Sequence, residues 1–244
     1  MESLSPIGEN QGIRFFYESK ELDSIQPSAS VIPYWYRKVP LTLAQPDGTV
    51  KPSVKNCFPF AEALNIGYLL LTTEDYVFSQ ESNGMRVTSS TKDVFLGRPP
   101  KQSVVENPIP EGYLRSAMSW SNPVSIEIPE GYSCLFTHPM NRFDIPFFTF
   151  SAVVDGYYKM PPGDIAFVIR ADFEGVIPAG TPYAQVIPFQ RQDFVFEENK
   201  GLLQRTEEHF AEIVSRSKDY GEEWRNQKKE YTRNSWKKKS YKIQ

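Results

Sequence analysis

Thiols and imidazoles are the first side chains to consider, because they ligate metals and act as nucleophiles and bases. The 244-residue chain carries two of each, and these four are Cys57, Cys134, His138 and His209. Only Cys134 and His138 are close in sequence, whereas a structural zinc site normally shows paired spacings such as C-x2-C. The sequence therefore predicts no metal site, and His209 is expected to be a helix-surface residue.

A nucleophilic pair of Cys134 and His138 is also excluded. Residues 131–138 have the apolar pattern of a strand that ends before Pro139. Side chains four residues apart on a strand are separated by about 13 Å, too far for a proton transfer. Cys134 is therefore predicted to be a small core residue.

Signature loops of common enzyme classes are missing. The chain contains no G-x-S-x-G, no P-loop and no G-x-G-x-x-G. The sequence therefore gives no support for a hydrolase with a nucleophile elbow, for a kinase or for a Rossmann-type dinucleotide-binding protein. One constellation remains: Asp155 follows an apolar strand, Tyr158 comes three residues later, and Gly180, Ala184 and Gln185 lie further along. Taken alone, Asp155 before a glycine is a turn former, and Gln185 in an apolar strand is a satisfied core amide.

The order and spacing of these residues resemble the dUTPase and dCTP deaminase family, whose fold is the β-clip. The resemblance covers residues 60–190, with 65–70 as the opening strand. It implies that Asp155 orders the attacking water and that Tyr158 lies beneath the deoxyribose. The nucleotide-binding candidates that it implies are Tyr158, His138, Asn141, Arg142 and Gln185.

Departures from the family pattern argue against catalysis. Leu69 stands where the family carries a metal-facing acid, and leucine cannot coordinate Mg²⁺ because hard cations require oxygen ligands. The phosphate-binding motif of the family aligns with residues 137–142, which keep Pro139 and Arg142 but lack both serines. The glycine-rich segment that closes the family's site is absent. Triphosphate hydrolysis needs metal, phosphate clamp and water base together. The resemblance thus implies the fold, with catalysis lost or altered.

Nearly the whole chain also resembles an uncharacterised family of proteins in tailed bacteriophages. The family has no established activity, so this resemblance implies a phage origin and little mechanism. The stretches that carry it are 32–38, 54–60, 131–136, 185–191 and 236–241.

Short strands must position these residues. Twenty prolines and 34 aromatics (4 Trp, 13 Tyr and 17 Phe) argue against a helical bundle. Strand signals recur about every ten residues, which favours an all-β sandwich or barrel. A short helix is expected at 61–64, and Pro-Gly turns at 161–164 and 178–181. The predicted strands are 68–73, 76–78, 85–89, 147–154 (buried on both faces), 165–169 and 183–187.

The composition changes near residue 200. Residues 201–244 hold 11 Lys/Arg and 7 Asp/Glu, a net of +4, while the first 200 hold 16 and 23, a net of −7. All the prolines precede residue 200. We therefore expect an irregular aromatic and proline-rich segment (1–55), a β-clip-like body (56–200) and a basic amphipathic helical arm (201–244).

Aromatic and basic side chains mark two candidate docking patches. Residues 32–40 are expected to form a surface loop whose aromatics plug the edge of the core, or else a partner-docking patch. The arm is expected to dock on the body or on a neighbouring subunit. Because its cations alternate with aromatics, nucleic-acid binding through residues 225–244 is the alternative. The docking candidates are Trp35, Tyr36, Arg37, Trp224, Trp236, Lys237, Lys238 and Lys239.

Charge and hydropathy restrict the setting. The formal charge of −3 gives no global reason to bind nucleic acid or an anionic membrane. No apolar run reaches the length of a membrane span, and the first residues lack the pattern of a secretory leader. Two cysteines favour a reducing compartment.

Two functions remain open. The first is a non-catalytic, phage-encoded β-clip-like protein that acts as a structural, binding or host-interaction component. It would self-associate, as a trimer by analogy with dUTPases, and contact a virion or host protein in the infected host cytoplasm or the virion. The alternative is a divergent dUTPase-like nucleotide hydrolase or nucleotide-binding protein. No cofactor is expected for the first function, and Mg²⁺ only for the alternative.

Overall fold

The structure is a computed structural model that describes residues 12–17, 24–81, 84–89, 109–155, 163–196, 207–209 and 211–212. The chain divides into two compact units. The first comprises residues 1–33 and 63–191, and the second comprises residues 34–62 and 192–244.

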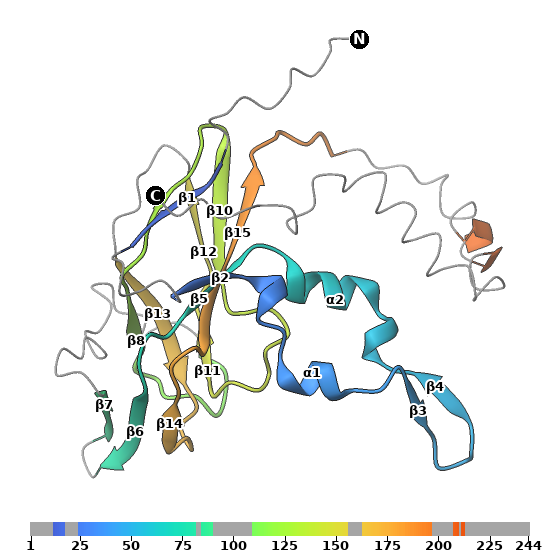
Figure 1. The fold of residues 1–244 in the computed structure, drawn as a ribbon, viewed down its shortest axis with the longest axis horizontal. Helices are drawn as coiled ribbons and strands as arrows, with labels where there is room; N and C mark the ends of the chain where they lie inside the picture. The colour runs from blue at the N-terminus through green and yellow to red at the C-terminus, as the bar shows by residue number, and fades with distance from the viewer. Residues whose placement is uncertain are drawn as a thin grey trace. The chain divides into compact units, whose positions relative to one another are not determined.

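The largest sheet of the first unit has five antiparallel strands in the order β12–β10–β15–β5–β2 (Figure 1). In its centre, β15 pairs with β10 on one side and β5 on the other, which places Gln185 opposite both Thr137 and Leu69. The strands are β2 (Ile25–Pro27), β5 (Tyr68–Leu71), β10 (Tyr132–Thr137), β12 (Ala152–Asp155) and β15 (Pro182–Gln190).

Three smaller antiparallel sheets contain the other strands that the structure describes in this unit. One has the order β11–β13–β8, with strands Phe147–Thr149, Gly163–Ile169 and Met118–Asn122. Another has the order β14–β6–β7, with strands Gly175–Ile177, Tyr76–Glu81 and Gly84–Ser89. The last pairs β1 (Arg14–Phe16) with β9 (Ser125–Glu127).

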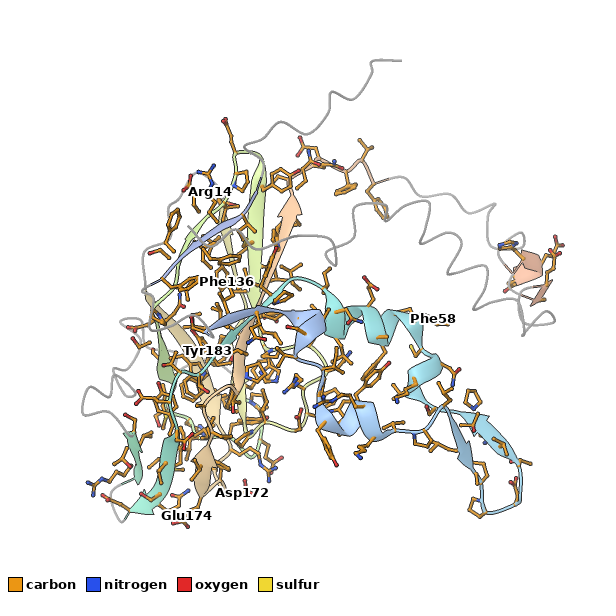
Figure 2. All side chains as sticks on the ribbon, viewed as in Figure 1. Arg14, Phe58, Phe136, Asp172, Glu174 and Tyr183 are labelled. Atoms are coloured by element: carbon orange, nitrogen blue, oxygen red, sulfur yellow. The ribbon has the colours of Figure 1, made fainter. Side chains whose placement is uncertain are left out.

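Aromatic side chains fill the core of the first unit. Trp120 is 2% exposed, stacks on Phe167 with ring centroids 4.1 Å apart, and meets Phe147 edge-on at 4.9 Å. Phe136 and Tyr183 from the five-stranded sheet belong to the same cluster (Figure 2). The smaller sheets are therefore held to the large one by burial of large apolar surfaces, the main favourable term in folding.

Gly67 allows β5 to start close to β15. Its φ of 71° lies in the left-handed region, and an added Cβ would stand 2.2 Å from the backbone oxygen of Val186. Its carbonyl accepts the backbone N–H of Ser28 at 3.0 Å. Only glycine meets both demands, because any side chain would collide with the neighbouring strand.

The second unit contains helices and one hairpin within residues 34–62. Helix α1 (Tyr34–Lys38) leads into β3 (Thr42–Ala44), which pairs with β4 (Val50–Pro52) around a turn at Gly48. The 3-10 helix η3 (Val54–Asn56) and the start of α2 (Phe58–Asn65) follow. A further 3-10 helix, η2 (Ser28–Ser30), belongs to the first unit.

The mainly β architecture predicted from the sequence is confirmed, as are strands at 76–78, 85–89, 165–169 and 183–187. The strands predicted at 68–73 and 131–138 are also present but shorter, since β5 ends at Leu71 and β10 spans Tyr132–Thr137. The short helix predicted at 61–64 lies inside α2, and the turn at 178–181 carries Gly180 with a φ of 81°. Of the turn predicted at 161–164, residues 161 and 162 lie outside the described residues, and Gly163 and Asp164 already belong to β13.

Two predictions of local structure are wrong. Residues 147–154 form two strands, because the chain leaves β13 after Phe150 and pairs with β10 from Ala152 onward. Their outer residues Phe148 and Val153 are 38% and 52% exposed, so the run is not buried on both faces. Residues 34–38, expected to be loop, form helix α1.

The predicted helical arm lies mostly outside the described residues. Residues 207–209 and 211–212 are helical and exposed, which includes His209 on a helix surface as expected. Among the helices that the structure describes, none combines the length and the apolar character of a membrane span.

Candidate functional site

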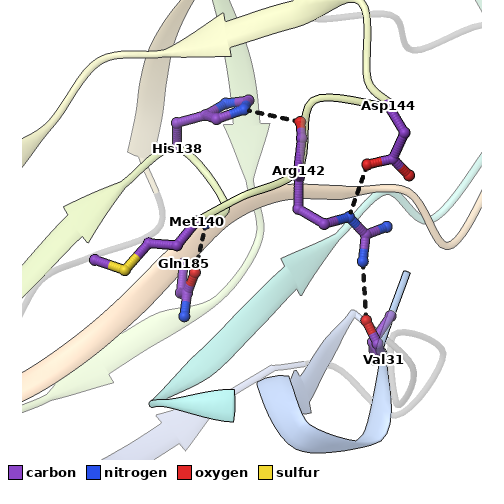
Figure 3. Close-up of polar contacts among 6 residues, drawn as sticks. All are labelled: Val31, His138, Met140, Arg142, Asp144 and Gln185. Atoms are coloured by element: carbon purple, nitrogen blue, oxygen red, sulfur yellow. Dashed lines mark hydrogen bonds and ion pairs between the residues drawn. The ribbon is translucent and has the colours of Figure 1, made fainter. Parts of the chain in front are cut away.

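Four of the candidate residues, His138, Asn141, Arg142 and Gln185, lie around the loop 138–146, which joins β10 to β11. Figure 3 shows three of them, His138, Arg142 and Gln185. Within this loop, the N–H of Arg142 donates to the carbonyl of Pro139 at 3.2 Å, closing a turn. Asn141 sits in the turn with a φ of 58°, the one positive φ of a non-glycine residue among those described. Asparagine tolerates this left-handed conformation better than most residues, so Asn141 has a local backbone role.

Gln185 reaches from β15 to hold this turn. Its side-chain carbonyl accepts the N–H of Met140 at 2.7 Å, and its amide donates to the carbonyls of Ile66 at 2.7 Å and Ala63 at 3.1 Å. The residue is 1% exposed. These three bonds engage both ends of the amide, as the sequence interpretation of a satisfied core amide requires.

His138 is bonded at both ring nitrogens. Its Nδ1 accepts the backbone N–H of Thr149 at 3.3 Å, so its Nε2 carries the proton and donates to the carbonyl of Arg142 at 3.4 Å. The ring stacks on Phe148 with centroids 5.0 Å apart. Burial lowers the pKa of His138 from 6.5. The imidazole is thus a neutral cross-link between two backbone segments.

Arg142 is largely buried within the first unit. Its side chain is 10% exposed, and its Nη1 donates to the carbonyl of Val31 at 2.9 Å. Its Nε lies 3.4 Å from Asp144 Oδ1, an ion pair without hydrogen-bond geometry. Burial lowers the pKa of Arg142 from its ordinary value. The guanidinium donates to the protein's own backbone, whereas a guanidinium that binds phosphate would have to face the ligand.

Asp155 lies at the other end of β10. It stands opposite Ser133, whose hydroxyl donates to Asp155 Oδ1 at 2.9 Å. Arg191, one residue beyond β15, pairs with the same carboxylate through Nη2 and donates from Nε to Ser133 Oγ at 2.8 Å. The carboxylate therefore belongs to a three-residue polar cluster of Ser133, Asp155 and Arg191.

The structure divides the predicted nucleotide set into two groups. Gln185 stands opposite Thr137, and Asp155 stands opposite Ser133, four residues away on β10. That spacing corresponds to about 13 Å along the sheet. Asp155 is thus not brought together with the group at the turn, and Tyr158 lies outside the described residues.

Leu69 and Cys134 are both core residues. Leu69 is 3% exposed and lies between Gln26 and Gln185 of the neighbouring strands. Cys134 is fully buried, and burial raises the pKa of its thiol to about 12. No group of three or more His, Cys, Asp or Glu suited to a metal ion occurs within the described residues.

The aromatic docking candidates of the second unit pack around helix α1. Tyr36 stacks on Phe60 with centroids 5.9 Å apart, and Trp35 meets both rings edge-on, at 5.6 Å and 6.2 Å. The carbonyl of Arg37 accepts Lys55 Nζ at 3.0 Å. The candidates that lie outside the described residues are Trp224, Trp236, Lys237, Lys238 and Lys239.

Sequence reasoning missed Ser133, Thr149 and Arg191 as partners of the candidate residues. Their roles depend on pairing between β10, β12 and β15, and on the loop 138–146, which link residues far apart in sequence. The only signal available was strand alternation, which puts Ser133 and Thr137 on one face of β10.

A scan of the chain against protein-family models finds no match, and a search of curated proteins finds no similar sequence. The two family resemblances drawn from the sequence therefore stay predictions.

Proposed function

We propose that this chain is a non-catalytic, phage-encoded protein with a β-clip-like body, which acts as a self-associating structural or binding component. One observation carries the proposal: the described side chains that would perform nucleotide chemistry are bonded to the protein itself. Asp155 is paired with Arg191 and Ser133, and Arg142 donates to Val31. His138 and Gln185 bond to backbone groups.

Asp155 is poorly placed to act as a base. A general base needs a lone pair within reach of the water that it activates. Oδ1 of Asp155 already accepts from Ser133 and Arg191. The hydrogen bond from Ser133 and the ion pair with Arg191 therefore occupy this oxygen.

The position of Leu69 supports the same conclusion. In the family that the sequence resembles, this position faces the metal, whereas here it is an apolar side chain buried in the central part of the five-stranded sheet. A triphosphate bound without a cation would keep its full negative charge in the site, and catalysis of phosphoryl chemistry depends on neutralising that charge.

The setting follows from the second resemblance. A phage origin places the protein in the infected host cytoplasm or in the virion, where a protein without an active site serves through its contacts with other chains. The exposed apolar side chains of the second unit, among them Leu41, Val50 and Phe194, support a role in assembly.

Purified full-length protein should be incubated with each common deoxynucleoside and ribonucleoside triphosphate and Mg²⁺. We expect no release of phosphate, pyrophosphate or ammonia above the buffer rate, and no rise in melting temperature with any nucleotide. The matched variant is Asp155→Asn, which keeps the shape of the side chain. Magnesium-dependent turnover that Asp155→Asn abolishes would overturn the proposal and support the nucleotide hydrolase instead.

A further inference from the structure

The β3–β4 hairpin is exposed on both faces. All six residues of its two strands are exposed to solvent. Leu41, Leu43 and Val50 are 64%, 43% and 64% exposed. Figure 1 shows the hairpin extending away from α1, the helix that precedes it. A two-stranded sheet without a covering partner is marginally stable in water, so this hairpin is suited to receive one.

The outer edge of β3 can accept another strand. The N–H of Gln45 donates to Thr49 and that of Ser53 to Leu41, so the hydrogen-bonded pairs of the hairpin involve residues 41, 43 and 45 of the first strand. Pairs alternate in an antiparallel ladder, which directs the backbone groups of Thr42 and Ala44 outward.

The outer edge of β4 is a poorer template. The outward-facing residues of this strand are Val50 and Pro52, which stand opposite Ala44 and Thr42. Proline has no N–H to donate to an added strand, and it is a common means of blocking a sheet edge. The hairpin therefore has one complete edge, on β3.

A second exposed apolar segment follows β15. Phe194, Val195 and Phe196 are 88%, 86% and 90% exposed. Within the part of the chain that the structure describes, residues 193–196 lie in no helix or strand. Phenylalanine and valine favour strands, and three adjacent exposed apolar residues are unusual on a protein surface unless a partner covers them.

We propose that residues 193–196 of one copy of this chain add as a third strand to the outer edge of β3 in a second copy. In such β-augmentation, main-chain hydrogen bonds supply affinity and alternate side chains supply specificity. Phe194 and Phe196 would lie on one face of the extended hairpin and Val195 on the other. The inference rests on the proposed self-associating function and names the surfaces involved.

The exposure of both elements favours a second copy as the occupant. Both elements are exposed within a single chain, so its own segment does not cover its own hairpin. Charge does not oppose the contact, since residues 41–53 hold one Lys and one Asp, a net of zero, and residues 193–196 hold one Asp, a net of −1. Exchange of identical elements between copies is a low-cost route to assembly.

Molar mass measured by light scattering tests the proposal on the full chain. We expect wild-type protein to run as an oligomer. Ala44→Pro removes an outward N–H from β3, and the double variant Phe194→Ser/Phe196→Ser removes the apolar segment. Each should lower the mass to that of one chain, 28.0 kDa. The matched control, Val50→Pro, changes the unused edge of β4 and should leave the oligomer intact.

Mixing the two defective variants separates strand addition from other modes of assembly. Ala44→Pro protein still has its segment, and the double variant still has its edge, so the mixture can form one interface and should yield a species of two chains. Urea unfolding of the first unit, unchanged in all variants, shows that they are folded.

Three results would overturn the inference: a wild-type monomer, assembly that survives both changes, or equal loss of assembly with Val50→Pro and Ala44→Pro. A monomer whose residues 42–44 are protected from hydrogen exchange would show that the chain's own segment is the occupant. Assembly through another surface would leave the proposed function standing, whereas nucleotide turnover would end that function independently of these variants.

Discussion

Gln185 and Met140 are 45 residues apart in sequence, and the side-chain carbonyl of Gln185 accepts the N–H of Met140 at 2.7 Å. This bond ties the turn at 139–142 to the central strand of the five-stranded sheet. The same side chain donates to the carbonyls of Ala63 and Ile66 before β5. One amide thus joins three segments of the first unit.

Replacing this amide should destabilise the fold. Gln185→Leu leaves three partly buried backbone groups without this partner, and we expect a loss of about 2–4 kcal/mol in the free energy of unfolding. Urea denaturation followed by tryptophan fluorescence measures the loss. Gln190→Leu, at the exposed end of the same strand, is the control and should change stability by less than about 0.5 kcal/mol.

Stability should depend on pH through His138. Its pKa in the folded protein is lower than the unfolded value of 6.5. The unfolded chain therefore binds more protons between these two values, so stability is complete above 6.5 and falls as the pH drops toward the folded pKa. Melting temperatures between pH 8 and pH 5 measure this loss.

The matched variants for this test use the chain's two histidines. His138→Gln should be less stable at pH 8 and should lose part of the decline on acidification. His209→Gln changes an exposed side chain and should leave the decline as in the wild type. An identical decline in all three proteins would contradict a role for His138.

Gly67 should tolerate no side chain. A Cβ at this position would lie 2.2 Å from the oxygen of Val186, in addition to the strain of a φ of 71°. We expect Gly67→Ala to cost clearly more than the ~1–2 kcal/mol of the conformation alone. Gly131→Ala isolates that strain, because Gly131 has a φ of 78° and nothing within 4 Å of its added Cβ. Equal losses in the two variants would argue against the close approach of β5 and β15.

The pair formed by Asp155 and Arg191 should couple weakly. The Arg191 side chain is 57% exposed, so solvent screens the attraction. A double-mutant cycle with Asp155→Asn and Arg191→Gln should give a coupling of about 0.5–1 kcal/mol. Unfolding free energies of the four proteins supply this number. A coupling near zero would remove the ion pair as the reason for leaving Asp155 out of catalysis.

Local patterns in the sequence were sufficient to determine the mainly β class, most strands and the core position of Cys134. Alternation and apolar runs report which side of a strand is buried, and proline and glycine mark its ends, so short-range chemistry decides these features. The burial of Leu69 and the satisfied amide of Gln185 were also predictable, because each lies within an apolar strand.

Pairing between distant segments decided the rest. The run 147–154 belongs to two sheets, since Phe147 pairs with Ile169 and Ala152 with Phe136. Pairing of β10 with both β12 and β15 brings Arg191 to Asp155, and the loop 138–146 brings His138 to Thr149. A hydrogen bond or an ion pair depends on the distance between two groups in space. Only the tertiary structure brings such residues together, and so only it could show that the candidate catalytic groups are bonded to the protein itself.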